Sequence, residues 1–220
     1  MELGQLVNIM WEGTLESLYM TLISTLLAYL FGIPIGVILY VTDKGGIAEH
    51  SAINKVLGVV VNLLRSVPFI ILLVAILPFT RMVVGTTIGA NATIVPLVVA
   101  ATPFVGRMVE SSLKEVDGGI IEAALSMGSN NLQIITKVLL PEAKPSLIVG
   151  STIAITTILG YSAMAGFVGG GGLGSIAINY GYYRYQEDIM FITVILLVIV
   201  VQIFQETGMR IAAGTDKRKR

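Results

Sequence analysis

The chain of 220 residues contains no cysteine and a single histidine, His50. Without a thiol it can form no disulfide, no thiolate metal site and no cysteine nucleophile. One isolated histidine does not supply the three or four ligands that a protein zinc site requires. These absences exclude disulfide scaffolds, zinc modules and cysteine-dependent enzymes.

Charge is also scarce. Charged residues make up 13% of the chain and hydrophobic residues 55%, whereas soluble domains carry about 25% charged residues. The one long polar stretch runs from about residue 107 to residue 144, which leaves no room for a large extramembrane domain. The composition therefore excludes a soluble globular domain and predicts a polytopic, all-α integral membrane protein.

Basic residues are missing from the N-terminal region, where the first is Lys44. A secretory signal needs a basic segment before its apolar core, so we expect the first apolar stretch to be a retained span. A membrane-crossing helix needs about 20 mostly apolar residues. The stretches that satisfy this requirement are about 17–41, 56–80, 86–106, 145–165 and 188–208.

The remaining basic residues are distributed asymmetrically. Only Arg81 and Arg184 fall in loops on one side, and Arg65 lies inside the second expected span. The other side carries Lys44, Lys55, Arg107, Lys114, Lys137, Lys144, Arg210, Lys217, Arg218, Lys219 and Arg220. Because basic loops stay in the cytoplasm, we expect the N-terminus outside and the C-terminus and the 107–144 loop inside. The terminal run Lys217–Arg220 then fits an anchor at anionic headgroups better than a nucleic-acid site.

The polar loop contains the signals of a short helix. Asp117 is a candidate N-cap, and Glu122 would lie favourably in the helix dipole. Ala123 and Ala124 favour helix and allow another surface to approach closely. Gly128 permits the backbone to turn out of the helix.

A second short helix follows. Asn130 and Gln133 have the spacing of a capping box, and Pro141 is expected to end the helix. Its predicted apolar face consists of Leu132, Ile135, Val138 and Leu139. The residues alone leave two interpretations open: an amphipathic connection between spans, or a docking surface for a cytoplasmic partner.

The order of residues in this loop resembles a known pattern: Glu-Ala-Ala, three residues, Gly, nine residues, an aliphatic residue, one residue, Leu-Pro. This is similar to the cytoplasmic coupling loop of ABC importer permeases. The resemblance implies that the loop contacts an ATP-hydrolysing subunit. The residues it assigns to that contact are Glu122, Ala123, Ala124, Leu125, Ser126, Met127, Gly128 and Pro141.

Three further segments resemble the methionine importer permeases: RSVPFIILL, VPLVVAATPFVGRMVE and GYSAMAGFVGGGGLG. This likeness implies a type I ABC importer permease fold with five transmembrane helices in the cell inner membrane, translocating D- or L-methionine. It further implies a second copy of the chain, two ABC ATPase subunits and an extracytoplasmic binding protein or lipoprotein, with membrane lipid around them. It implies no enzyme activity, no cofactor bound by this chain and no nucleic acid.

Gly169, Gly171 and Gly174 satisfy the G-x-G-x-x-G string of dinucleotide sites. They follow an expected membrane span instead of a strand, so we interpret them as a tight or flexible outer turn. No G-x-x-x-x-G-K-[ST] motif occurs in the chain, and ATP would therefore be hydrolysed by another subunit.

Several residues within the spans have two interpretations. Arg65 either snorkels or forms an internal salt bridge, or it lines the pathway, and Pro68 after it suggests a bend. Tyr161, Ser162 and Met164 are either ordinary packing residues or a gate. Gly32 and Gly36 allow close helix packing, within one chain or between two copies.

Other functions remain as alternatives at this point. One half of an ion-coupled secondary transporter would need acidic residues inside the membrane, yet Glu16 and Glu206 lie only near span ends. An intramembrane enzyme would need a nucleophile and a base, which no motif provides. Among importers, another amino acid or a small osmolyte is the alternative cargo.

Overall fold

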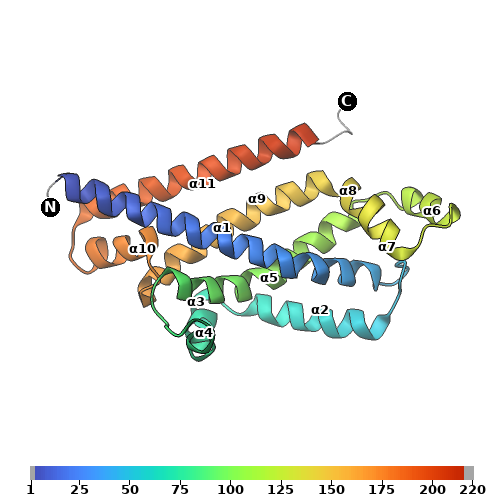
Figure 1. Cartoon of the computed structure of the whole chain (residues 1–220), viewed down its shortest axis with the longest axis horizontal. Helices are drawn as coiled ribbons and strands as arrows, with labels where there is room; N and C mark the ends of the chain where they lie inside the picture. The colour runs from blue at the N-terminus through green and yellow to red at the C-terminus, as the bar shows by residue number, and fades with distance from the viewer. Residues whose placement is uncertain (1–2, 216–220) are drawn as a thin grey trace. The chain divides into compact units, whose positions relative to one another are not determined.

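The computed structural model describes residues 3–215, and over that range the regular secondary structure is all helical, with no strand (Figure 1). The main helices are α1 (Leu3–Val41), α2 (Ser51–Ser66), α3 (Phe69–Ala75), α4 (Leu77–Val84), α5 (Ala90–Lys114), α6 (Gly118–Ser126), α7 (Asn131–Ile134), α8 (Leu140–Glu142), α9 (Lys144–Met164), α10 (Gly172–Ile176) and α11 (Glu187–Thr215). Two π-helical turns, Ile135–Leu139 and Ala177–Tyr182, and a 3-10 turn, Ala165–Val168, connect some of them. The basic run Lys217–Arg220 lies outside the described residues.

Four helical segments in the described range are long and apolar enough to cross a membrane: Gly4–Val41, Ala90–Lys114, Lys144–Tyr182 and Glu187–Thr215. The pair α2 and α3 makes a fifth if the two are counted as one broken span. The helices differ from the expected spans mainly in length, since α1 begins at Leu3 and α11 continues to Thr215.

The expected span 56–80 is broken. The axes of α2 and α3 differ by 99°, and Pro68 precedes α3 with φ −59° and ψ 134°. Proline lacks the N–H that would continue the helix, and it forces Val67 before it out of the helical region. The bend predicted from Pro68 is confirmed.

The chain divides into two compact units, and each long helix contributes residues to both. The first unit contains the chain up to Leu27, then Val67–Ala101 and Ala154–Gln205. The second contains Ala28–Ser66, Thr102–Ile153 and the chain from Glu206 onward. The predicted coupling loop belongs entirely to the second unit. The segment 166–174, called the glycine run from here on, belongs to the first unit.

In the first unit a small apolar core forms where α10 lies along the early turns of α1 (Figure 1). Met10, Leu173, Ile176 and Ile189 are buried there. A Cβ on Gly13 would lie 2.3 Å from Cδ1 of Ile176. The absence of a side chain on α1 at this point is what allows α10 to approach.

In the second unit α1 and α5 pack closely through small residues. A Cβ on Gly32 would lie 2.6 Å from Cγ1 of Val105, and one on Gly36 would lie 2.5 Å from the carbonyl oxygen of Gly106. The close-packing motif at Gly32 and Gly36 therefore serves a contact within one chain, which settles the alternative left open by the sequence.

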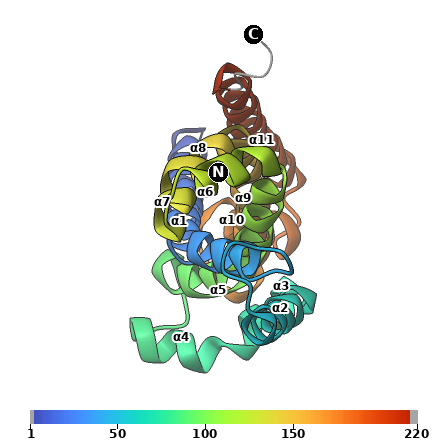
Figure 2. The same ribbon diagram turned by 90° about the vertical axis from the view of Figure 1, so that its right-hand side faces the viewer.

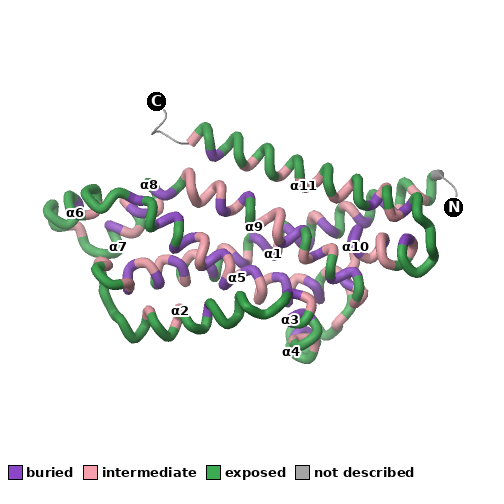
Figure 3. The backbone as a smooth tube through the Cα atoms, turned by 180° about the vertical axis from the view of Figure 1, so that it is seen from behind, coloured by how far each residue is buried: buried purple, intermediate pink, exposed green. Residues whose placement is uncertain are grey.

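Burial differs sharply between helices (Figure 3). Buried positions recur along α5, whereas α2 and α11 are largely exposed. In the most apolar part of α11 only 11% of the residues are buried. An apolar helix with so little cover fits surroundings that are themselves apolar, either lipid or another protein chain.

Candidate coupling surface and polar network

The polar loop between α5 and α9 begins with the helix α6. A side chain caps the N-terminus of this helix, and backbone N–H groups cap its C-terminus. The Gly119 N–H donates to the Asp117 carboxylate at 2.7 Å, so Asp117 is the N-cap, as predicted. At the other end the Gly128 N–H donates to Leu125 O at 2.9 Å, and the Ser129 N–H donates to Ala124 O at 3.1 Å. These two bonds form a Schellman motif.

Gly128 is the residue that allows this ending. Its φ is +77°, in the left-handed region that costs other L-residues about 1–2 kcal/mol. A Cβ placed on it would meet no atom within 4 Å. Gly128 is therefore required for its backbone conformation, while the space around it is open to a partner.

The second helix, α7, begins with the predicted capping box. The Gln133 N–H donates to Asn130 Oδ1, and the Asn130 N–H donates to Gln133 Oε1, both at 2.9 Å. The two bonds satisfy backbone donors at the start of a helix of only four residues. Figure 2 looks toward the end of the second unit that carries α6, α7 and α8.

The prediction that Pro141 ends this helix is wrong. After α7 the chain continues through the π-helical turn 135–139, and Pro141 lies inside α8. In an α-helix the proline ring would collide with the carbonyl group four residues earlier. The wider turn, in which the Leu140 N–H donates to Ile135 O, accommodates the proline without ending the helical path.

The π turn also changes which residues face the interior. Ile134 and Leu139 are fully buried, five residues apart, whereas Leu132 is 68% exposed. The predicted face of Leu132, Ile135, Val138 and Leu139 assumed uninterrupted α-helical spacing. It is correct for Leu139 and wrong for Leu132.

Apart from Pro141 on α8, the residues assigned to ATPase coupling form a mostly exposed surface on α6 and the turn after it. Glu122, Ala123 and Ser126 are exposed, and so are the large apolar side chains Leu125 (47%) and Met127 (80%). Ala124 differs, because it is only 3% exposed and packs inside the unit. Its small size lets α6 lie against its own chain.

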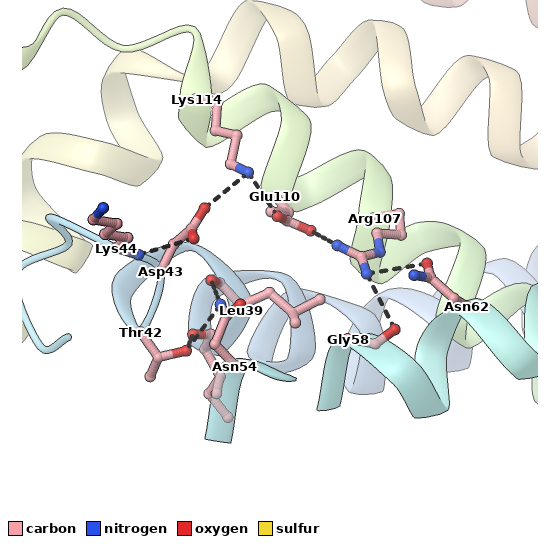
Figure 4. A network of polar contacts seen from close by, with 11 residues as sticks. Leu39, Thr42, Asp43, Lys44, Asn54, Gly58, Asn62, Arg107, Glu110 and Lys114 are labelled. Atoms are coloured by element: carbon pink, nitrogen blue, oxygen red, sulfur yellow. Dashed lines mark hydrogen bonds and ion pairs between the residues drawn. The ribbon is translucent and has the colours of Figure 1, made fainter. Parts of the chain in front are cut away.

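A network of charged and polar groups lies where α5 leads toward this loop (Figure 4). The Glu110 carboxylate accepts from Arg107 at 2.5 Å and from Lys114 at 2.9 Å. Lys114 also contacts Asp43 at 3.1 Å, after the end of α1. The Glu110 side chain is only 8% exposed. A charge buried to this extent depends on its partners, and removing one partner of such a pair typically costs about 3–5 kcal/mol.

The same network reaches α2. The Arg107 guanidinium donates to Asn62 Oδ1 at 3.0 Å and to the Gly58 carbonyl oxygen at 3.2 Å. At the other end, the Lys44 backbone N–H and the Lys114 ammonium hold the pKa of Asp43 below its usual range. The network thus ties α2, α5 and the α1–α2 loop together. The network was not expected from the sequence, although Arg107, Glu110 and Lys114 have the three- and four-residue spacing of helix ion pairs.

The residues proposed for the pathway fall in different units. In the first unit the Tyr161 ring stacks on Phe69, with centroids 4.5 Å apart and planes 3° from parallel. Ser162 is buried and donates to Leu159 O, whereas Met164 is 48% exposed. Arg65 belongs to the second unit, where it is exposed and forms no ion pair with any described residue.

The sequence predicted either a tight or a flexible turn at the glycine run, and the structure shows a tightly packed one. The Gly172 N–H donates to Glu16 Oε2 at 2.7 Å, and the Leu173 N–H donates to Ser17 Oγ at 2.9 Å. The Glu16 carboxylate and the Ser17 hydroxyl thus accept from backbone N–H groups at the start of α10. In the residues that the structure describes, no strand precedes these glycines.

Comparison with known proteins gives consistent results at three levels. Residues 32–211 match the model of the family described as "Binding-protein-dependent transport system inner membrane component". The chain is 50% identical to the probable D-methionine transport system permease protein MetI of Vibrio cholerae, over 96% of this chain and 94% of that protein. It is 44% identical to the methionine import system permease protein MetP of Bacillus subtilis, over 95% and 94%.

A solved structure is similar along the whole chain. It is one of the inward-facing conformations of the MetNI methionine ABC transporter, with a TM-score of 0.96 and 46% sequence identity. The match covers 99% of this chain and 100% of that one.

Proposed function

The chain belongs to the family of binding-protein-dependent transport system inner membrane components, and we propose that the cargo it carries across the membrane is methionine. It is an all-helical permease subunit of an ABC importer, located in the inner membrane. The observation that carries the choice of cargo is the extent of the likeness. Relatives named as methionine permeases match at 44–50% identity over nearly the entire chain.

The proposed topology has five spans, in which α2 and α3 form one span broken at Pro68. The N-terminus lies outside, and the loop containing α6 and α7 lies in the cytoplasm. The support is the distribution of basic residues, since Lys114, Lys137 and Lys144 all lie in or beside this loop. The glycine run and the loop containing Arg184 are then on the outer side.

The segment 117–134, which contains α6 and α7 and is called the α6–α7 loop from here on, is proposed to dock on an ATPase subunit. One such subunit would bind to each of two permease copies. Exposed Leu125 and Met127 would provide the apolar contact, and Gly128 the turn that presents them. The exposed residues Glu122 on α6 and Pro141 on α8 complete the proposed contact. ATP would bind to the partner, and this chain itself would bind no cofactor.

In the proposed cycle, ATP-driven closure of the two ATPase subunits moves both α6–α7 loops, and the pathway between the two permease copies changes from inward-open to outward-open. An extracytoplasmic binding protein then delivers methionine past a gate near Tyr161, Ser162 and Met164. Such coupling must be reciprocal in binding free energy. The state of the permease should therefore alter the affinity of the ATPase for nucleotide.

The test is to co-purify the chain with its native ATPase and binding protein, reconstitute the complex in proteoliposomes, and measure uptake and ATPase activity with each amino acid in turn. The expected result is that methionine-loaded binding protein stimulates both. Stimulation by another amino acid or an osmolyte, with none by methionine, would overturn the assignment of the cargo. Uptake that persists without ATP and collapses with an ionophore would contradict the importer mechanism.

A further inference from the structure

Two adjoining cavities lie within the second unit, beside α5 and α9. One measures about 380 Å³ and the other about 410 Å³. They share the lining residues Ser112, Glu115, Ser146 and Val149. Sites for small molecules typically measure about 300–1,000 Å³, so each cavity is large enough for an amino acid.

The 410 Å³ cavity is lined by side chains of both charges. Its basic members are Arg65 and Arg107, and its acidic member is Glu115. Arg107 already has partners within the chain, since its guanidinium hydrogen-bonds to Glu110, Asn62 and Gly58. Arg65 and Glu115 are both exposed, and neither forms a salt bridge within residues 3–215. The cavity therefore presents one cation and one anion that form no salt bridge with any other described residue.

The rest of the lining is small, polar or apolar. Ser111, Ser112 and Ser146 bring hydroxyl groups, and the Ser146 hydroxyl bonds to that of Ser112 at 3.0 Å. Met108, Val149 and Ile153 provide apolar surface. A free amino acid with an apolar side chain carries a carboxylate, an ammonium and an apolar group. Each has a chemically matched counterpart in this lining.

We propose that this cavity is a transit site for the zwitterionic cargo within the permease, with Arg65 binding the α-carboxylate and Glu115 the α-ammonium. The proposal rests on the proposed function and adds a binding site to it. The site would recognise an amino acid by its α-carboxylate and α-ammonium groups. The side chain meets only the apolar wall of Met108, Val149 and Ile153, which accommodates a thioether without a specific polar contact.

The absence of cysteine provides a direct test. Ser111→Cys places the only thiol of the chain in the cavity wall, and Ser51→Cys, at the exposed start of α2, is the matched control outside it. In the complete complex with ATPase and binding protein, the rate of labelling by a charged methanethiosulfonate is measured with and without methionine. At about ten times its Kd, methionine should slow labelling of Ser111→Cys by about tenfold and leave Ser51→Cys unchanged.

The charges are then removed one at a time in the Ser111→Cys background. Arg65→Gln and Glu115→Gln should each abolish the protection, whereas Arg65→Lys should retain part of it. Methionine amide, which lacks the carboxylate, and 4-(methylthio)butanoate, which lacks the ammonium, should each protect less than methionine. Arg81→Gln, on α4 in the other unit, is the control arginine substitution and should leave protection intact.

Methionine uptake by the Ser111→Cys complex distinguishes a failure of the transit site from a failure of the proposed function. If that complex imports methionine but methionine does not protect the thiol, or if protection survives both Arg65→Gln and Glu115→Gln, the transit site is wrong while the proposed function stands. If the complex containing the unsubstituted chain imports no methionine, the proposed function itself fails.

Discussion

Glycine serves opposite purposes in two regions of this chain. At the turn after α6, a Cβ on Gly128 would meet nothing within 4 Å, and the residue is needed only for its φ of +77°. In the glycine run, a Cβ on Gly174 would lie 2.2 Å from Ala163 O, and one on Gly166 would lie 2.3 Å from the carbonyl carbon of Gly174. These glycines are required because backbone segments touch.

The difference indicates where each region makes its contacts. The glycine run is packed against its own unit and held by Glu16 and Ser17 of α1. The α6–α7 loop instead leaves Leu125, Met127 and Leu132 exposed. Exposed apolar residues gathered on one loop are typical of a surface that a partner covers, whereas the glycine run is covered by residues of its own unit.

The largest effect is expected from Gly174→Ala. Because the added methyl group would overlap backbone atoms that no side-chain rotation can move, overpacking should destabilise the unit by about 1–3 kcal/mol or more. The measurement is the yield of monodisperse protein in detergent and its thermal unfolding. Gly160→Ala, where nothing lies within 4 Å, is the control and should behave like the parent chain. Equal behaviour of the two variants would refute the steric account of the glycine run.

Gly128→Trp should separate folding from transport. The left-handed backbone costs about 1–2 kcal/mol with a side chain present, so the protein should still insert, while the bulky ring prevents docking on the ATPase. Uptake should be lost, together with stimulation of the ATPase by loaded binding protein. Gly128→Asn, a small residue that tolerates this conformation, should retain most of both activities. Normal uptake by the Trp variant would remove this loop from the coupling path.

Glu16→Gln should weaken the hold of α1 on the glycine run by up to about 1.5 kcal/mol, the lower end of the contribution of a hydrogen bond to a charged group. The amide oxygen still accepts from Gly172, which is why the loss is partial. The check is the shift in thermal unfolding relative to Glu12→Gln, one turn away on α1. A shift no larger than that of the control would show that the 2.7 Å bond contributes little.

The smallest effect is expected from Asn130→Ala, which removes the capping box of α7. Loss of an N-cap side chain costs about 1 kcal/mol, and here it should loosen the start of a four-residue helix. Hydrogen exchange of the Gln133 amide should accelerate in this variant and stay unchanged in Asn131→Ala. If both variants leave the exchange rate unchanged, the cap does not hold the loop in place.

Local capping signals were readable from the sequence because they act over three or four residues. Asp117, Gly128 and the Asn130–Gln133 pair were all placed correctly, and so was the bend at Pro68. The resemblance of the same loop to importer permeases identified the family correctly. Each of these signals depends on neighbours in the chain, which a single sequence shows directly.

Longer-range features were not readable in the same way. Because of the π turn before Pro141, Ile134 is buried in place of Leu132, which was predicted to be buried. No pattern in the sequence predicts such a turn. The burial of Ala124 and the contact of Gly172 with Glu16 depend on which helices meet. Only the spacing of Arg107, Glu110 and Lys114 could have indicated the polar network in advance, and even that spacing does not reveal its contact with Asp43.

The central claim is that the α6–α7 loop is the surface that meets the ATPase. The most direct test is photo-cross-linking from a single thiol at Met127→Cys, with Tyr185→Cys, equally accessible in the proposed outer loop, as the reference. In the assembled complex Met127→Cys should link to the ATPase subunit, whereas Tyr185→Cys should not. Links from Tyr185→Cys to the ATPase, with none from Met127→Cys, would contradict it.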